Sequence, residues 1–302
     1  MLNGILLIDK PAGMSSAQLL ARVKRHSRVR KAGHAGTLDP FATGVLICCV
    51  NQATRLARFL LQGEKKYEAL LRLGITTDTQ DFTGRIIASE NVPEMLEEDL
   101  KTLFREFEGE QMQQPPPFAA LKYQGTPLYK LARQGKPIQK PARPVAIKQL
   151  RILNIQLPDI LFQVTCSAGT YIRTLCADIG QRIGCGGHLS QLRRTAASGF
   201  SIVQAVTFET LKDKGTDLRH RWLIPMAEAL GHMPEVTAND QMVEHIQFGR
   251  QLSKEMMPLI MKQVHPTQYD GFIKVVDYQR QLKAVIQQAP DGIMYNYCCV
   301  FH

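Results

Sequence analysis

One passage dominates this sequence of 302 residues: Gly33-His34-Ala35-Gly36-Thr37-Leu38-Asp39-Pro40-Phe41-Ala42-Thr43-Gly44. Three glycines surround a single carboxylate, Asp39, and Pro40 follows it directly. Glycine lets a backbone approach another group closely, and proline disfavours helical backbone angles in the residue before it. The passage therefore predicts a loop that holds Asp39 at a fixed angle. The plain alternative is an Asp-Pro turn closed by an Asx hydrogen bond.

The segments on either side of this passage predict a strand, a basic helix and a second strand. Residues 4–8 are apolar and end in a Pro/Gly turn that contains Lys10 and Pro11, and residues 15–16 offer a serine cap for the helix. Ten residues towards the end of this helix hold six cations and no acid: Arg22, Lys24, Arg25, Arg28, Arg30 and Lys31. Such a cluster favours phosphate contact, although a solvated helix face is the plain reading. Residues 45–50 form the second, buried strand.

The charge balance indicates a polyanionic partner. Lys and Arg number 37 against 27 Asp and Glu, which gives a net charge of +10. Nucleic acid is the leading partner for such a surplus, ahead of an anionic membrane. Residues 111–158 contain no acid but eight cations, with Phe118, Tyr123 and Tyr129 among them. Cations for phosphates and rings for bases predict RNA contact; a surface hairpin with buried aromatics would explain the rings but not the missing acids.

Several function classes lack their motifs in this sequence. We find no phosphate loop ending in Lys-Ser/Thr, no Gly-x-Gly-x-x-Gly fingerprint after a strand and no zinc-deaminase signature. Cys185 and His188 are spaced like half of a zinc site, but no second half is present, so no metal is expected. The N-terminus has no signal-peptide pattern and no apolar run approaches ~20 residues, so we expect a cytoplasmic protein that does not enter the membrane.

Other segments carry strand or helix patterns. The tail from about Met233 changes character and reads as a small all-β module. The expected elements are strands at Tyr67–Leu73, Ile160–Ser167, Phe272–Val276 and Leu282–Gln287, and helices at Pro93–Phe107 and Tyr171–Ile183.

Residues 33–44 closely resemble the signature of the TruB family of pseudouridine synthases, Gly-His-x-Gly-x-Leu-Asp-Pro-x-Ala-Thr-Gly. Further segments resemble other family motifs in the same order: Asp9–Ser16 the opening motif, Lys66–Asp81 the tyrosine-bearing strand and loop, and Cys166–Gly180 the arginine motif. Residues 114–133 are similar to the RNA-gripping insertion of the family. The match extends from about Gly4 to Thr195, so a chance likeness is very improbable.

The resemblance implies an α+β fold with a large mixed, mainly antiparallel sheet flanked by helices. Residues 1–232 would form the catalytic domain, with the insertion at about 111–145. Residues 233–302 would form a PUA-like RNA-binding β-barrel, although the end of the chain lacks the Pro-Arg-rich finish expected of that module.

The resemblance also implies a reaction. The chain would convert the uridine at position 55, in the T loop of tRNA, to pseudouridine by base flipping. It would act as a monomer on the T arm, with no cofactor, guide RNA or obligatory protein partner. The alternatives are a synthase for another RNA, a non-catalytic tRNA-folding chaperone, and another base-flipping enzyme such as a methyltransferase.

By the same resemblance, three residues would be catalytic. Asp39 would be the nucleophile, adding to the base or attacking the sugar; the sequence does not choose between these routes. Arg173 would pair with this carboxylate, keeping it ionised and aimed. Tyr67 would stack on the target base and serve in proton transfer at C5, whereas its plain reading is a core aromatic.

Three more residues would bind the substrate. His34 matches a histidine that helps to extrude or replace the flipped base, and a hydrogen-bonded loop histidine is its alternative. Tyr171 and Leu192 match positions that line the uridine pocket, and for Leu192 a core role is the alternative. Lys10 and Pro11 are interpreted as a turn that supports the nucleophile loop.

Overall fold

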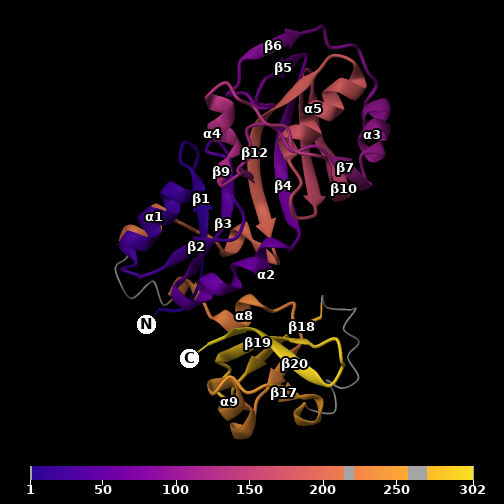
Figure 1. Ribbon diagram of the computed structural model, residues 1–302. Coiled ribbons are helices and arrows are strands. Elements are labelled where there is room, and N and C mark those ends of the chain that lie inside the picture. Colours follow the sequence, from indigo (N-terminus) through magenta and orange to yellow (C-terminus); the bar gives the residue numbers. More distant parts are fainter. Residues whose placement is uncertain (1, 214–220, 258–270, 302) are drawn as a thin grey trace.

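The computed structural model describes residues 2–213, 221–257 and 271–301, and these form two β-sheets of unequal size (Figure 1). The larger sheet has eleven strands and the smaller, C-terminal one has five. Two hairpins, β5 (Ile75–Thr77) with β6 (Ile86–Ser89) and β8 (Lys122–Tyr123) with β9 (Thr126–Pro127), lie outside both sheets.

The large sheet is mixed and mainly antiparallel, as predicted. Among its strands within the described residues, only the pairs β1–β14 and β3–β12 are parallel. Its main path runs β14 (Val206–Thr207), β1 (Gly4–Lys10), β3 (Thr43–Val50), β12 (Gly187–Ala197), β4 (Lys65–Leu73), β11 (Asp159–Cys166), β10 (Arg143–Gln156) and β7 (Gly109–Gln113). Three short strands branch from it: β2 (Ala32–His34), β13 (Phe200–Ser201) and β15 (Leu223–Ile224). The predicted strands at residues 4–8, 45–50, 67–73 and 160–167 are therefore confirmed.

Helices flank this sheet: α1 (Ser16–His26), η1 (Asn51–Leu56), α2 (Ala57–Leu61), α3 (Glu97–Glu106), α4 (Leu128–Arg133), α5 (Ile172–Ile183), η2 (Ile202–Gln204), α6 (Phe208–Asp213) and α8 (Met226–Ala229). Ser15 caps α1 in a reciprocal capping box with Gln18, as the serine pair predicted. The helix predicted at 93–107 begins only at Glu97, because Leu96 keeps an extended backbone and supplies no side-chain cap. That prediction was therefore four residues too long at its start.

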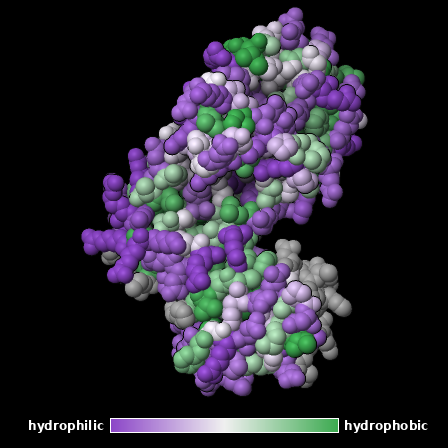
Figure 2. Space-filling view, in the orientation of Figure 1, coloured by the Kyte–Doolittle hydropathy of each residue, from purple (hydrophilic) through white to green (hydrophobic). Residues whose placement is uncertain are grey.

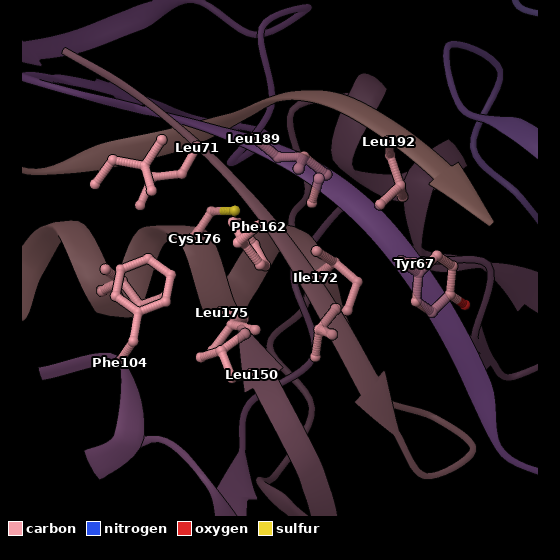
Figure 3. Packing of buried hydrophobic residues seen from close by; sticks show 14 of the residues in the cluster. Tyr67, Leu71, Phe104, Leu150, Phe162, Ile172, Leu175, Cys176, Leu189 and Leu192 are labelled. Atoms are coloured by element: carbon pink, nitrogen blue, oxygen red, sulfur yellow. The ribbon is translucent and has the colours of Figure 1, made fainter. Parts of the chain in front are cut away.

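The main core lies where α5 and α3 cover the large sheet (Figure 3). Phe104 of α3 meets Phe162 of β11 edge to face, with ring centroids 5.7 Å apart. Tyr67 and Leu192 lie together at one end of the same cluster, on the neighbouring strands β4 and β12. The hydrophobic core therefore runs directly up to two of the residues predicted to bind substrate.

The C-terminal sheet is open and curled, in the order β16 (Glu235–Thr237), β18 (Phe272–Val276), β19 (Leu282–Gln288), β20 (Met294–Val300) and β17 (Leu252–Ser253), with α9 (Asp240–Gln247) and η3 (Lys254–Met256) beside it. The two strands predicted in the tail, 272–276 and 282–287, are present. Part of the predicted module, residues 258–270 and 302, lies outside the described residues.

The C-terminal sheet shares a core with the rest of the chain. Phe59 of α2 packs edge to face on Phe272 at a centroid distance of 5.1 Å, and Val285 and Phe301 belong to the same buried cluster. Arg58 Nη2 also donates to the carbonyl of Cys298 at 3.0 Å. A division of the chain at residue 233 stays a prediction, and any such module is firmly docked beneath α2 (Figure 1).

Candidate active site

Asp39 lies on the loop that joins β2 to β3, and a buried lysine supports this loop from below. Lys10 is fully buried at the end of β1, where its ammonium donates to the carbonyls of Pro11 (2.9 Å), Pro40 (3.1 Å) and Ala42 (2.7 Å). The predicted supporting turn is thus confirmed. The Lys10 ammonium binds backbone carbonyls of the residues that follow Asp39, not the Asp39 carboxylate itself.

The start of α1 holds the other side of the loop. The Ser16 hydroxyl accepts from the Leu38 amide at 2.9 Å and donates to the Leu38 carbonyl at 3.0 Å. The amide of Ala42 donates to the main-chain carbonyl of Asp39, not to its carboxylate, at 3.1 Å. The Asx turn considered as the alternative does not form here, and the carboxylate is left to other partners.

The main partner of that carboxylate is Arg173, in the first turn of α5. Its Nε lies 3.0 Å from one carboxylate oxygen of Asp39 and its Nη2 lies 3.4 Å from the other, which is a two-point contact. The Arg173 side chain is only 5% exposed, while that of Asp39 is 32% exposed. The fold therefore brings together two predicted site residues that are 134 positions apart in sequence.

A second carboxylate, Asp81, holds Arg173 from behind and was not predicted as a site residue. Its Oδ2 lies 3.5 Å from Arg173 Nη1, and its Oδ1 accepts from Thr79 Oγ1 and the Thr83 amide, each at 2.9 Å. The sequence signal was available, because Asp81 ends the Thr-Asp-Thr-Gln-Asp loop that follows the tyrosine-bearing strand.

The electrostatics of Asp39 are set by opposing effects. Burial raises the pKa of its carboxyl above the ordinary value, and the negative charge of Asp81 adds to the rise. Arg173 and Lys10 lower the pKa of Asp39 and oppose that rise. Burial likewise lowers the pKa of the Lys10 ammonium to about 8. A carboxylate in these surroundings depends on its cations to stay ionised.

Asp39 opens into a cleft of about 360 Å³ whose wall includes Tyr67, Tyr171, Arg173 and Leu192. This size suits a small ligand or a single extruded nucleotide base. Tyr67 is 9% exposed, and burial raises the pKa of its phenol. These residues bring one carboxylate, two phenol rings, one guanidinium and an apolar side chain to the cleft, whose wall also includes the cations Lys65, Arg143 and Arg194.

Tyr171 is fixed by its backbone just before α5. Gln113, which is buried, accepts from the Tyr171 amide at 2.7 Å and donates to the Tyr171 carbonyl at 3.0 Å. The Arg143 guanidinium lies over the Tyr171 ring, 5.1 Å from its centroid. Sequence reasoning counted Arg143 only among the cations expected to contact RNA and gave Gln113 no role, because contacts so distant in sequence leave no local pattern.

His34 is the one predicted site residue that does not line this cleft. It ends β2, five positions before Asp39, and its Nδ1 is buried without a hydrogen-bond partner in the structure. Burial lowers the pKa of the imidazole, and the nearby Arg194 lowers it further. His34 is therefore held neutral beside the loop, and its role in base extrusion stays a prediction.

The predicted insertion borders the cleft, since Ala120 and Leu121 form part of its wall. The cation–ring pairs of the insertion are Lys140 over Tyr123 at 5.0 Å and Arg133 over Tyr129 at 5.7 Å. Figure 2 shows hydrophilic side chains over most of this face of the molecule, with small, scattered hydrophobic patches.

Clusters of metal-binding side chains and membrane-spanning helices are both absent from the part of the chain that the structure describes. No group of three or more His, Cys, Asp or Glu side chains there could hold a metal ion. Within the same ranges, no helix is long and apolar enough to cross a membrane.

Comparisons with known proteins agree with this geometry. Residues 24–172 match the family model described as "TruB family pseudouridylate synthase (N terminal domain)", and residues 173–231 match "tRNA pseudouridylate synthase B C-terminal domain". The tRNA pseudouridine synthase B of Syntrophobacter fumaroxidans is 44% identical over 252 residues, which are 82% of each chain. That of Pseudomonas aeruginosa is 43% identical over 295 residues, covering 96% of this chain and 93% of the relative.

Solved structures support the same relationship. A chain in "Crystal Structure of a Cbf5-Nop10-Gar1 Complex" superposes with a TM-score of 0.76 at 27% identity, covering all of this chain and 85% of that one. A chain in "Structure of H/ACA RNP bound to a substrate RNA containing 2'-deoxyuridine" gives 0.74 at 25% identity, covering 99% and 85%.

Proposed function

The chain belongs to the TruB family of tRNA pseudouridine synthases, which are isomerases, and from this we propose that it isomerises the T-loop uridine of tRNA without a guide RNA. The observation that carries the proposal is the two-point contact of Arg173 with Asp39 at the wall of the cleft that also holds Tyr67.

The target uridine would leave its stack and enter the cleft. Extrusion of a base costs a few kcal/mol, which contacts to the RNA must offset. Tyr67, Tyr171 and Leu192 provide two rings and an apolar side chain for the extruded base. The cations of α1 and of the insertion would bind phosphates around it.

The reaction breaks the bond from ribose C1′ to N1 and forms a bond from C1′ to C5. An Asp39 oxygen would add to the base or attack C1′, and both routes remain open. The proton on C5 leaves and N1 gains one, so no redox partner is needed. We propose that Tyr67, as a phenolate, receives the C5 proton and becomes a neutral phenol, since Tyr67 lines the same cleft.

Arg173 would keep the nucleophile ready. Its positive charge opposes the rise in the pKa of Asp39 that burial causes, and its two nitrogens fix the carboxylate plane. Asp81 would hold the guanidinium in that orientation.

The test is tritium release from an unmodified tRNA transcript labelled at uridine C5, comparing the protein with Asp39→Asn. Asp159→Asn is the matched control, because Asp159 also pairs with an arginine, Arg72, but at an exposed site at the far end of β11. We expect release from the T-loop uridine only, abolished by Asp39→Asn and retained by the control. Release from another uridine would show that the enzyme modifies a different RNA position. Tight tRNA binding without tritium release would favour the alternative function, a non-catalytic tRNA-folding chaperone.

A further inference from the structure

Arg194, on the central strand β12, carries a charge in the interior of the molecule. Arg194 is 1% exposed, and its side chain is one of the largest that are fully buried within the described residues. A buried charge is very costly unless hydrogen bonds satisfy it. The partners of this guanidinium therefore indicate what it does.

Two of those partners lie at the two ends of the nucleophile loop. Arg194 Nε donates to the Val45 carbonyl at 2.7 Å, and Nη2 donates to the Gly36 carbonyl at 3.0 Å. The backbones also touch, because a Cβ added to Gly44 would lie 2.2 Å from the Arg194 carbonyl oxygen. Gly36 and Val45 bracket Asp39, so one side chain ties down both ends of the loop.

The third partner is the hydroxyl of Tyr67. Arg194 and Tyr67 are opposite each other in the β12–β4 pair and both line the cleft, so the guanidinium acts directly on the phenol across the two strands. Burial raises the pKa of the Tyr67 phenol; Arg194 lowers it, while Cys166 and Asp39, which also face the phenol, raise it further. A cation that donates to an oxygen stabilises that oxygen when it carries negative charge.

We propose that Arg194 is a positioning residue that fixes the nucleophile loop relative to Tyr67 and supports, through the Tyr67 hydroxyl, removal of the proton from C5. The inference rests on the proposed function. Once the C1′–C5 bond has formed, the C5–H electron pair returns to the uracil ring and the proton passes to the Tyr67 oxygen. The oxygen accepts it as a phenolate, whose own proton has gone to solvent, and becomes the neutral phenol again. The guanidinium keeps its own protons throughout, because an arginine does not deprotonate in proteins.

Lys10 shows how a purely supporting cation would differ. Its ammonium is also fully buried and also binds the loop, but all three of its acceptors are backbone carbonyls. Arg194 reaches the same loop and, in addition, a side chain of the cleft. A supporting role predicts only a slower reaction, whereas the proposed role predicts a change in the proton-transfer step itself.

The experiment compares single-turnover pseudouridine formation on tRNA that carries protium or deuterium at the target C5. Arg194→Lys keeps the charge but cannot reach all three acceptors with a planar fork. Arg193→Lys is the control, since the neighbouring Arg193 does not line the cleft and pairs with Asp9 at 2.7 Å.

We expect Arg194→Lys to slow turnover by about 10-fold to 100-fold, on the scale of one lost hydrogen bond to a charged group, with a larger C5 isotope effect than the wild type. Affinity for tRNA and the isotope effect of Arg193→Lys should match the wild type. A slower Arg194→Lys reaction with an unchanged isotope effect would overturn the proposal, and so would a wild-type rate.

Tyr67→Phe keeps the inference testable if Arg194→Lys fails to fold, as thermal unfolding would reveal. This variant removes only the hydroxyl through which Arg194 acts, so the same enlarged isotope effect is expected. A Tyr67→Phe enzyme with the wild-type isotope effect would overturn the inference. Failure of the proposed function can be told apart from failure of this inference, because in the first case the wild-type protein itself would release no tritium from the T-loop uridine.

Discussion

The nucleophile loop, residues 33–44, and the insertion, residues 111–145, both depend on positive charge but use it in opposite ways. Beneath the loop, the buried Lys10 and Arg194 donate to backbone carbonyls, and Arg173 grips Asp39 itself. Across the insertion, none of the cations forms an ion pair with an acid of the described residues.

This difference teaches that net charge alone says little about function. A buried cation costs desolvation, and here it is committed to fixing the geometry of one carboxylate. An exposed cation costs little and stays free for a phosphate. The comparison predicts that substitutions beneath the loop reduce kcat, whereas substitutions in the insertion raise KM.

The largest effect should come from Arg173→Gln. Without the guanidinium, the pKa of Asp39 rises further, because Arg173 is the main cation that opposes the effect of burial. We expect kcat at neutral pH to fall by about 100-fold or more, the scale of breaking a buried ion pair. Part of the activity should return as pH increases and Asp39 ionises, which a pH profile of single-turnover rates would measure.

Asp81→Asn is the control that separates charge from orientation. It also disturbs Arg173, but it removes a negative charge that raises the pKa of Asp39. This variant should slow the reaction without moving its pH dependence upward. An upward movement in both variants would contradict the view that Arg173 acts through the ionisation of Asp39.

Lys10→Met should have the next largest effect, since it leaves two carbonyls of the nucleophile loop, those of Pro40 and Ala42, and the Pro11 carbonyl without their donor. We expect kcat to fall about 10-fold to 100-fold with little change in KM, because hydrogen bonds to charged groups are the stronger ones. Lys283→Met, which removes a lysine paired with Asp277 in the C-terminal sheet, is the control for a lost cation elsewhere. A change in KM alone would contradict a supporting role for Lys10.

A smaller effect should follow from pH alone. Burial lowers the pKa of Lys10 to about 8, and that of Lys65, at the start of β4 in the cleft wall, to about 8 as well. Each ammonium therefore loses its proton as the pH rises through that value. The neutral amine has one donor fewer. The rate should therefore fall severalfold between about pH 7 and about pH 9. The fall should be shallower in Lys10→Met, whose side chain cannot titrate, and an equal fall would exclude Lys10 as its source.

Much of the fold could be predicted from local patterns. Apolar runs bounded by Pro/Gly turns placed β1, β3, β18 and β19 within a few residues. The central strand β12 was not predicted, because its run Gly-His-Leu-Ser-Gln-Leu-Arg-Arg-Thr-Ala-Ala has no clean alternation. Two register shifts against β4 and the burial of Arg194 break the pattern, and both arise from tertiary contacts.

The candidate site was predictable to the extent that its residues lie in motifs. Asp39, Tyr67, Tyr171, Arg173 and Leu192 meet around one cleft. Asp81 lies in a recognisable motif, but the sequence did not show that its carboxylate pairs with Arg173, nor that the Arg194 guanidinium is buried, because the partners of both residues are distant along the chain. Such contacts follow from strand order, which propensity and periodicity do not determine.

The smallest effect, and the one that completes the comparison, is expected in the insertion. Lys140→Ala removes a half-buried cation that lies over the Tyr123 ring and has no acidic partner in the described residues. KM for tRNA should rise a few fold and kcat should be unchanged. The slope of the logarithm of the binding constant against the logarithm of the salt concentration should become shallower by about one. Lys101→Ala is the matched control, because Lys101 is similarly accessible but is paired with Glu97 and Glu98 on α3. Equal effects of the two substitutions would show that the insertion is merely basic surface, and only a loss specific to Lys140 assigns its charge to the RNA.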